Sequence, residues 1–242
     1  MTTVANHYKT HLAPVYLWMA GGFDAAVARG GGEIDAILPN SVSGATAVDL
    51  GAGFGMHSIP LARRGCAVLA VDTSALLLEV LRERAAELPV RLAEDDLLSF
   101  QGYVDSDVDL ILCMGDTLTH LPDQSSVEKL FSAAAQSLLP KGKFIATFRD
   151  YTSPLVGIRR FIPVRSDDER ILTCFLEYGA GHVDVHDLLH ERNGSGWELK
   201  VSAYRKLRLS PEWVSASLEA QGFEVRVEPG PAGMIRVVAA RV

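Results

Sequence analysis

The stretch Thr46-Ala47-Val48-Asp49-Leu50-Gly51-Ala52-Gly53-Phe54-Gly55 decides how this chain folds. A short β-rich run leads into three glycines at alternate positions, and residues 56–64 behind them have the apolar spacing of a helix. Glycine permits a tight turn and lets backbone N–H groups approach a ligand closely. The stretch therefore predicts a strand, a glycine turn and a helix, an arrangement that binds nucleotides.

Further along the chain, short β-rich runs alternate with longer helical runs. Strands are predicted over residues 67–72, 90–93, 108–113 and 144–148, and helices are predicted to follow Ser74 and Asp123, which are suitable N-caps. This alternation is typical of a parallel sheet with helices on its faces, so the predicted fold class is α/β.

The chain length favours a single domain with four parts. Residues 1–40 are predicted to form a helical cap with a break at Gly30-Gly31-Gly32, and residues 41–154 the cofactor-binding half. Residues 155–208, with glycine-rich turns such as 193–196, are predicted to be an antiparallel insertion. Residues 209–242 are predicted to close the domain with a helix over 211–221 and strands over 224–227 and 235–239.

Composition excludes several classes of protein. The 242 residues hold 23 Lys+Arg and 30 Asp+Glu, a formal charge of −7, which disfavours a nucleic-acid partner because that binding relies on basic side chains. No apolar run approaches the roughly 20 residues that span a bilayer, so no membrane partner is expected. The apolar stretch 12–23 is interrupted by Pro14 and Tyr16 and is not expected to be a secretion signal. Cys66, Cys113 and Cys174 are widely spaced and are predicted to be buried free thiols, which favours a cytoplasmic location.

Three features of the glycine turn restrict its ligand. Met56 stands where the dinucleotide fingerprint needs a third glycine, which disfavours NAD. Asp49 would repel a diphosphate but attract an ammonium group. Asp72, at the end of the second predicted strand, is placed to accept hydrogen bonds from ribose hydroxyls. A ligand with a ribose and an ammonium group but no phosphate is S-adenosylmethionine.

At this point the sequence resembles the class I S-adenosylmethionine-dependent methyltransferases over most of residues 45–242. The glycine stretch resembles the first motif of that family, residues 71–74 the second, residues 94–97 the third, and residues 138–143 the turn before the fifth strand. The resemblance implies a seven-stranded sheet whose last strand is antiparallel, and S-adenosylhomocysteine as the product of the cofactor. It implies that the cofactor is bound by Asp49, Gly51, Ala52, Gly53, Gly55, Asp72, Thr73, Asp96, Leu97, Met114 and Gly115.

The acceptor end of the site is predicted from residues 114–121. This segment resembles that of glycine N-methyltransferase and related small-molecule enzymes, with Asp116 in place of an asparagine, and it lacks the Asn/Asp-Pro-Pro-aromatic motif of enzymes that methylate DNA or protein amides. A carboxylate there would favour a cationic or hydrogen-bond-donating substrate, or act as a base. Asp116, His120 and Tyr151 are the candidate acceptors of the departing proton.

Four further residues are candidates for contact with the substrate. The resemblance implies that Arg149 binds a substrate carboxylate and that Tyr16 and Trp18 close over the site, and Tyr204 is placed late in the insertion. Simpler roles stay open: Arg149 as the partner of a nearby acid, Trp18 as core packing, and His120 as a cap or core residue. His182, Asp184, His186 and His190 alternate along one predicted strand, which an exposed polar face explains without a metal, so no metal is expected.

These observations predict an enzyme that transfers a methyl group from S-adenosylmethionine to a nitrogen of a small polar metabolite or natural-product intermediate. Positioning of the nucleophile is the main contribution expected from the protein. Methylation of oxygen is the alternative within the same class. A NAD-dependent oxidoreductase, which the glycine spacing and Asp49 oppose, and a non-catalytic cofactor-binding module are the alternatives from other classes. The sequence pattern indicates no particular oligomeric state.

Overall fold

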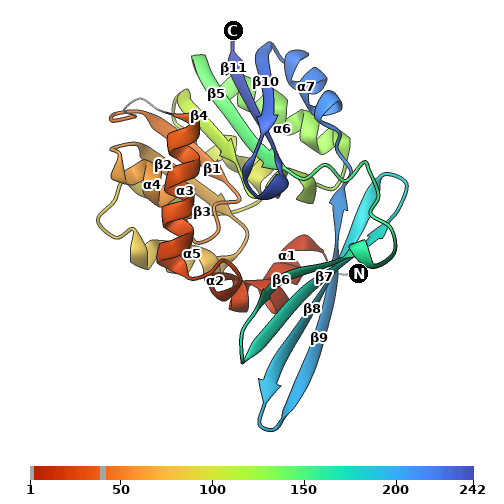
Figure 1. Ribbon diagram of the computed structural model, residues 1–242. Coiled ribbons are helices and arrows are strands. Elements are labelled where there is room, and N and C mark those ends of the chain that lie inside the picture. The colour runs from red at the N-terminus through yellow and green to blue at the C-terminus, as the bar shows by residue number, and fades with distance from the viewer. Residues whose placement is uncertain (1–2, 39–41) are drawn as a thin grey trace.

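The computed structural model describes residues 3–38 and 42–242, which form two β-sheets with helices around them (Figure 1). The larger sheet has seven strands in the order β10-β11-β5-β4-β1-β2-β3, and the smaller one has four in the order β6-β7-β8-β9. The strands are β1 (Thr46–Leu50), β2 (Ala67–Asp72), β3 (Val90–Glu94), β4 (Val108–Cys113), β5 (Leu138–Phe148), β6 (Phe161–Ser166), β7 (Arg170–Tyr178), β8 (His182–Asn193), β9 (Gly196–Leu207), β10 (Phe223–Pro229) and β11 (Ile235–Arg241).

Helices cover both faces of the seven-stranded sheet, and several short helices form the N-terminal segment before α3 (Phe23–Ile37). The helices are α1 (Val4–His7), the π-helix η1 (Tyr8–Leu12), the 3-10 helix η2 (Ala13–Val15), α2 (Tyr16–Met19), α3 (Phe23–Ile37), α4 (Ser58–Arg63), α5 (Ala75–Arg84), the 3-10 helices η3 (Leu97–Tyr103) and η4 (Thr117–His120), α6 (Gln124–Ser137), the 3-10 helix η5 (Gly157–Arg160), α7 (Pro211–Glu219) and the 3-10 helix η6 (Pro231–Gly233). Apolar side chains of α6 and α7 pack on one face of the sheet, and those of α3 and α4 on the other.

The strand pairing confirms the predicted fold. β1 pairs in parallel with both β2 and β4, while β11 runs antiparallel to both of its neighbours, β5 and β10. The carboxyl ends of β1, β2 and β4 therefore meet at one edge, which is where ligands bind in open α/β sheets. The predicted N-caps also form, since the Ser74 hydroxyl accepts from the Leu77 amide and the Asp123 carboxylate from the Ser126 amide.

The turn predicted before the fifth strand takes a different form. Helix α6 ends at Ser137, and β5 begins at once with Leu138. The register of β4 with β5 jumps from Val108 opposite Leu138 to Leu110 opposite Lys143. The Pro-Lys-Gly sequence lies in this irregular part of the pairing. The segment is therefore part of strand β5 and does not form a turn between α6 and β5.

The predicted break at Gly30-Gly31-Gly32 is wrong, because α3 runs through all three glycines. The reason for a glycine differs among them. A Cβ atom on Gly30 would lie 2.0 Å from the carbonyl oxygen of Met56, whereas a Cβ on Gly32 would meet nothing within 4 Å. Gly30 thus permits close contact between α3 and the segment behind the glycine turn.

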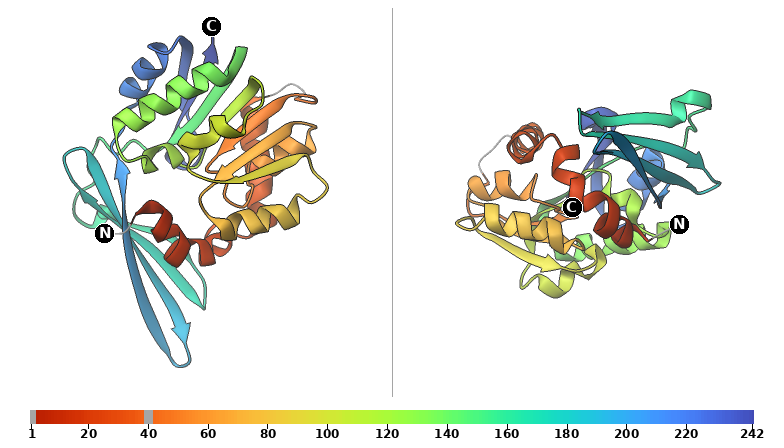
Figure 2. Two further views of the ribbon diagram at one scale, coloured as in Figure 1. Left: turned by 180° about the vertical axis from the view of Figure 1, so that it is seen from behind. Right: turned by 90° about the horizontal axis from the view of Figure 1, so that it is seen from below.

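The four-stranded antiparallel sheet extends away from the larger sheet, as Figures 1 and 2 show. Helices α1 and α2 lie in the space between the two sheets (Figure 1). Leu12 and Val15 of this N-terminal segment pack against Leu172 of β7 and Leu189 of β8 in one buried cluster. Within the described residues, no helix has the length and apolar character needed to cross a bilayer.

We expect opposite effects of alanine at two of the α3 glycines. Gly30→Ala should lower the free energy of unfolding by about 2–4 kcal/mol, because its Cβ would overlap the Met56 backbone. Gly32→Ala, the matched control in the same helix, should raise it by about 0.5–1 kcal/mol, because alanine favours helix where there is room. Urea denaturation measures both. Equal effects would contradict the close contact.

Candidate active site

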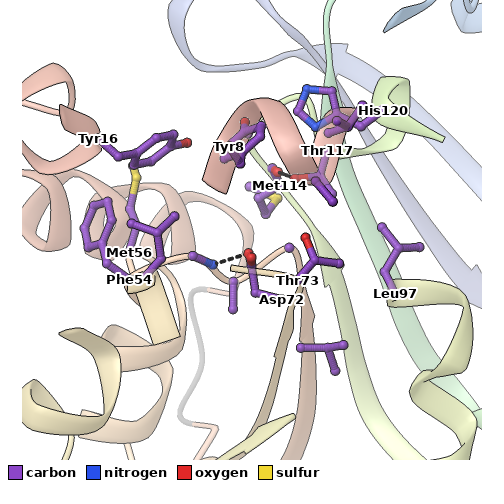
Figure 3. A pocket seen from close by; sticks show the side chains of 18 of the residues that line it. Tyr8, Tyr16, Phe54, Met56, Asp72, Thr73, Leu97, Met114, Thr117 and His120 are labelled. Carbon is purple, nitrogen blue, oxygen red and sulfur yellow. Dashed lines mark hydrogen bonds between the residues drawn. The ribbon is translucent and has the colours of Figure 1, made fainter. Parts of the chain in front are cut away.

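A cavity of about 260 Å³ opens at the carboxyl ends of β1, β2 and β4 (Figure 3). Its floor comes from the turns behind those strands, and its roof from the N-terminal segment together with His120. In the view of Figure 3, Tyr8 and His120 lie above Asp72 and Leu97. The lining residues are Val4, Ala5, Tyr8, Tyr16, Met19, Ala20, Gly51, Ala52, Gly53, Phe54, Met56, His57, Val71, Asp72, Thr73, Leu77, Asp95, Asp96, Leu97, Met114, Gly115, Thr117, His120, Leu121 and Pro122.

The glycine turn needs its glycines for backbone geometry and for space. Gly51, Gly53 and Gly55 have φ values of 73°, 54° and 90°. Residues that carry a side chain rarely adopt this backbone conformation. A Cβ on Gly51 would lie 2.5 Å from the Thr117 side chain, so this glycine lets the turn after β4 approach. Gly51 and Gly53 line the cavity, as does Ala52 between them, whereas Gly55 packs behind the turn against Leu81.

Asp72 is held at the cavity floor by two backbone amides. Its Oδ2 accepts from the Gly53 amide at 2.7 Å and its Oδ1 from the Ser74 amide at 2.8 Å. Burial raises the pKa of Asp72, and the hydrogen bonds from these amides oppose that rise. Each carboxylate oxygen keeps acceptor capacity for a ligand, and the adjacent Thr73 also lines the cavity.

Asp49 lies beneath the cavity instead of in its lining. Only 1% of its surface is exposed, and its Oδ2 accepts from the Ser58 hydroxyl at 2.6 Å. Burial raises the pKa of Asp49, while the charge of His57 and the Ser58 hydrogen bonds lower it. The lining therefore gives no support to the expected direct contact between Asp49 and an ammonium group, and the observed contact joins β1 to α4.

Three residues behind β3 add to the lining. Asp96 caps η3, since its Oδ1 accepts from the Leu98 amide at 2.8 Å. Asp95 lines the cavity too, with its Oδ2 accepting from the Tyr103 hydroxyl at 2.8 Å. Leu97 supplies an apolar wall beside them.

Behind β4, the segment 114–120 sends its side chains in two directions. Met114, Gly115 and Thr117 line the cavity together with His120. Asp116, in between, has a left-handed φ of 73° and is turned into a buried polar cluster away from the lining.

Three donors surround the Asp116 carboxylate. Its Oδ2 accepts from the Lys206 ammonium at 2.5 Å and from the Tyr151 hydroxyl at 2.9 Å, and its Oδ1 accepts from the Arg149 amide at 2.8 Å. Burial alone would raise the pKa of Asp116, but the charge of Lys206 and the hydrogen bonds from Lys206 and the Arg149 amide lower it. Neither Asp116 nor Tyr151 reaches the cavity, so neither has direct access to an acceptor there. Lys206 gave no signal in the sequence, because a lysine in an amphipathic strand is ordinarily exposed.

His120 is the proposed proton acceptor that does line the cavity. Its Nε2 is buried and, within the described residues, has no hydrogen-bond partner. Burial and the charge of Lys206 lower the pKa of His120 to about 3, so the imidazole is neutral near pH 7. Its ring packs beside those of Tyr8 and Tyr204, at centroid distances of 5.7 and 5.6 Å.

The roof contains one predicted residue and one that sequence reasoning missed. Tyr16 lines the cavity as predicted and meets Phe54 of the glycine turn at 6.0 Å between ring centroids. Tyr8, in the π-helix η1, lines it as well. An aromatic residue at helical spacing resembles ordinary core packing, so the sequence offered no means of singling out Tyr8.

Three residues predicted to contact the substrate lie outside the lining. The Trp18 indole donates to the Asp167 carboxylate at 2.5 Å, and the Arg149 guanidinium donates to the Ala232 carbonyl at 3.2 Å. Tyr204 is buried behind the roof, with its ring 4.2 Å from that of His7.

A buried pair joins the roof to the four-stranded sheet. His7 of α1 is fully buried, and its Nε2 lies 2.9 Å from an oxygen of Asp187 in β8. Its Nδ1 lies 2.8 Å from the Ser202 hydroxyl of β9, and the Cys174 thiol donates to the other Asp187 oxygen at 2.9 Å. These contacts fix α1, and with it the Tyr8 side chain, above the cavity.

Two of the three histidines of β8 lie beside acids. His182 lies 3.7 Å from the Asp184 carboxylate and His186 lies 3.2 Å from that of Glu177. Across residues 3–38 and 42–242, no group of three or more His, Cys, Asp or Glu is arranged to hold a metal ion.

Comparison with known proteins assigns the central part of the chain. Residues 47–142 match the family model described as a methyltransferase domain. The chain is 35% identical over 113 residues to the ubiquinone biosynthesis O-methyltransferase of Xylella fastidiosa (strain M23), covering 44% of this chain and 43% of that protein. It is 33% identical over 160 residues to the cypemycin N-terminal methyltransferase of a Streptomyces species, covering 57% and 62%. The chain therefore spans less than two thirds of either relative.

The fold also has counterparts among solved structures. The S-adenosylmethionine-bound amino pentose methyltransferase CalS10 of Micromonospora echinaspora, involved in calicheamicin biosynthesis, superimposes with a TM-score of 0.76 at 19% identity, covering 95% of this chain and 96% of that one. Together with the domain match, this similarity confirms the class I methyltransferase fold and the resemblance found in the sequence.

We expect the His7 contact to control the stability of the roof. His7→Ala should lower the free energy of unfolding by about 2–4 kcal/mol, because it leaves the buried Asp187 oxygen short of a partner and creates a cavity. It should also speed proteolytic cleavage within residues 3–20. His186→Ala, whose partner Glu177 is 63% exposed, is the control and should change stability by no more than about 0.5 kcal/mol. Urea denaturation and timed proteolysis measure the two effects, and equal results would contradict the anchoring role.

Proposed function

We propose that this chain transfers a methyl group from S-adenosylmethionine to a nitrogen atom of a small molecule, since residues 47–142 match the family model described as a methyltransferase domain. The observation that carries the proposal is the cavity where β1, β2 and β4 end, which has carboxylates at its floor and a neutral His120 with an unpartnered Nε2 at its roof.

The cavity chemistry fits a cationic nucleoside. Asp72 offers acceptor capacity for the ribose hydroxyls, Leu97 and Asp96 border the place for the adenine, and the amides of the glycine turn border the place for the methionine part. S-adenosylmethionine, when bound, supplies a methyl group made electrophilic by a sulfonium. Asp72, Asp95 and Asp96 give the lining acidic side chains that favour such a positive charge.

The carboxylates of the lining also disfavour the binding of a dinucleotide, which carries a diphosphate. In the described part of the chain, no lysine or arginine lines the cavity. A diphosphate would meet carboxylates with no basic side chain to offset them, which supports the sequence argument against NAD.

The protonation states of the titratable side chains in the roof favour nitrogen over oxygen as the atom that accepts the methyl group. A hydroxyl substrate needs a base with a pKa near the working pH, whereas a neutral amine already carries a free lone pair. Burial and Lys206 hold the pKa of His120 at about 3, too low for an efficient base near pH 7. Burial raises the pKa of both Tyr8 and Tyr16, so these hydroxyls stay protonated. The neutral His120 Nε2 can instead accept a hydrogen bond from an amine N–H and so orient the amine.

The names of similar proteins support both candidate atoms. Cypemycin N-terminal methyltransferase and the amino pentose methyltransferase point to amines. The ubiquinone biosynthesis O-methyltransferase, which matches at 35% identity, makes oxygen the second candidate. The absence of basic side chains from the lining, among described residues, disfavours an acceptor that carries a carboxylate, and Arg149 does not face the cavity to bind one.

Asp72→Asn tests the cofactor assignment. The amide keeps the shape of the side chain but loses the charge and half of the acceptor capacity, so we expect the Kd for S-adenosylhomocysteine to rise at least about tenfold, or about 1.4 kcal/mol. Isothermal titration calorimetry measures it. Asp105→Asn is the matched control at a side chain that is 92% exposed, and it should leave the Kd unchanged. Unaltered binding by the Asp72 variant would sink the assignment.

A screen with deuterated methyl donor tests the acceptor atom. We expect amines without acidic groups to gain the label and hydroxyl compounds to remain unlabelled. With an amine, kcat/KM should rise with pH up to the pKa of that amine, because only its neutral form reacts. No inflection should come from His120 between pH 5 and 9, since its pKa lies near 3. A labelled hydroxyl product, or an acidic limb near neutrality that His120→Gln removes, would favour oxygen.

A further inference from the structure

We propose that Lys206 is a specificity-determining positioning residue, which neutralises Asp116 and so keeps His120 as an uncharged hydrogen-bond acceptor at the acceptor end of the cavity. The inference rests on the proposed function, because it names the chemistry that this end of the site selects: an amine that donates an N–H to a neutral imidazole.

The first step of the argument is the position of Lys206 within the fold. The residue lies near the end of β9, and only 8% of its surface is exposed. Its ammonium group lies 2.5 Å from the Asp116 Oδ2, and Asp116 is itself only 4% exposed. Two charges so deeply buried are tolerated when each neutralises the other and the remaining hydrogen-bonding groups are satisfied. Tyr151 and the Arg149 amide supply those further hydrogen bonds to Asp116.

The second step is the connection between this pair and the cavity. Asp116 is followed at once by η4, which carries Thr117 and His120 into the lining. The left-handed φ of Asp116 is unfavourable for a residue with a side chain, so the surrounding contacts must hold it. The Lys206 ammonium is the charged member of those contacts. The pair therefore determines where the turn after β4 directs the imidazole of His120.

The third step is the set of groups that face His120. Lys206 and Tyr204 face it from β9, Asp116 from the start of its own turn, His7 from α1, and Tyr8 from η1. Burial has the largest effect and lowers the pKa of His120, Lys206 and His7 lower it further, and Asp116 raises it. Without the charge of Lys206, the Asp116 carboxylate would have no neighbouring ammonium and would favour a protonated His120. A protonated imidazole has no free lone pair and could no longer accept an N–H.

NMR titration of the free protein tests this inference without cofactor or substrate. The Cε1–H signals of the histidines are followed from pH 4.5 to 8.5, with His120 assigned through His120→Gln. In the wild-type protein we expect no titration of His120 in this range. Lys206→Gln keeps a hydrogen-bond donor beside Asp116 but removes the charge, and it should bring the His120 titration into the range. Lys206→Arg should restore the wild-type behaviour.

The double variant Asp116→Asn with Lys206→Gln is the matched control. It removes both charges together, so burial should again dominate and His120 should not titrate. A residue that merely filled space would give the same result in the single and the double variant. If Lys206→Gln does not fold, Lys206→Met, which also removes the charge, takes its place in the titration. Asp116→Asn alone leaves the lysine charge unopposed, so His120 must stay neutral in that variant. Titration of His120 in the wild-type protein or in Asp116→Asn, or its absence in a folded Lys206→Gln, would overturn the proposal.

The consequence for catalysis is measured with an amine that the labelling screen identifies. We expect the ratio of kcat/KM for Lys206→Gln over wild type to fall about tenfold for each pH unit below the His120 pKa that NMR finds in Lys206→Gln, because protonation removes the hydrogen-bond acceptor. The ionisation of the amine cancels in this ratio. The Kd for S-adenosylhomocysteine should remain within twofold. If no acceptor is methylated, the proposed function fails while the NMR result still decides the role of Lys206. A ratio independent of pH would contradict the specificity role alone.

Discussion

The hydrogen bond from the Gly53 amide to the Asp72 carboxylate is the interaction on which the site depends. It ties the turn behind β1 to the end of β2, so that two neighbouring parallel strands present their turns as one surface. Glycines with a positive φ make the turn behind β1 possible. The absence of a side chain at Gly51 lets the turn behind β4 pack against it. The floor of the cavity follows from these contacts.

The roof follows from a different principle, because it depends on contacts between segments that lie far apart in the sequence. Helix α1 is held where it brings Tyr8 over the floor by the contacts of His7 with Asp187 and Ser202 of the four-stranded sheet. The insertion therefore acts first as a support for the N-terminal segment. The roof and the sheet form one packed unit, and the shape of the cavity depends on both.

Charge is distributed unequally between the two ends of the cavity. The floor keeps its carboxylates in the cavity lining, which suits a cation, whereas the carboxylate nearest the roof, that of Asp116, is paired with Lys206 and turned inward. In the function that we propose, this difference separates the binding of a positively charged cofactor from the selection of an acceptor. It also explains how a chain with an acidic floor keeps a neutral imidazole above it.

The sequence by itself determined the parallel sheet, the glycine turn, and the place of Asp72, Asp96 and Leu97, because these depend on local propensity and on spacing along adjacent strands. Tertiary structure alone decided that Asp49 bonds to Ser58 and that Asp116 faces Lys206, 90 residues away. It also made Gly30 a contact point inside an unbroken helix. Such outcomes depend on which surfaces meet after folding, and no pattern along the chain encodes the direction in which a single side chain is turned.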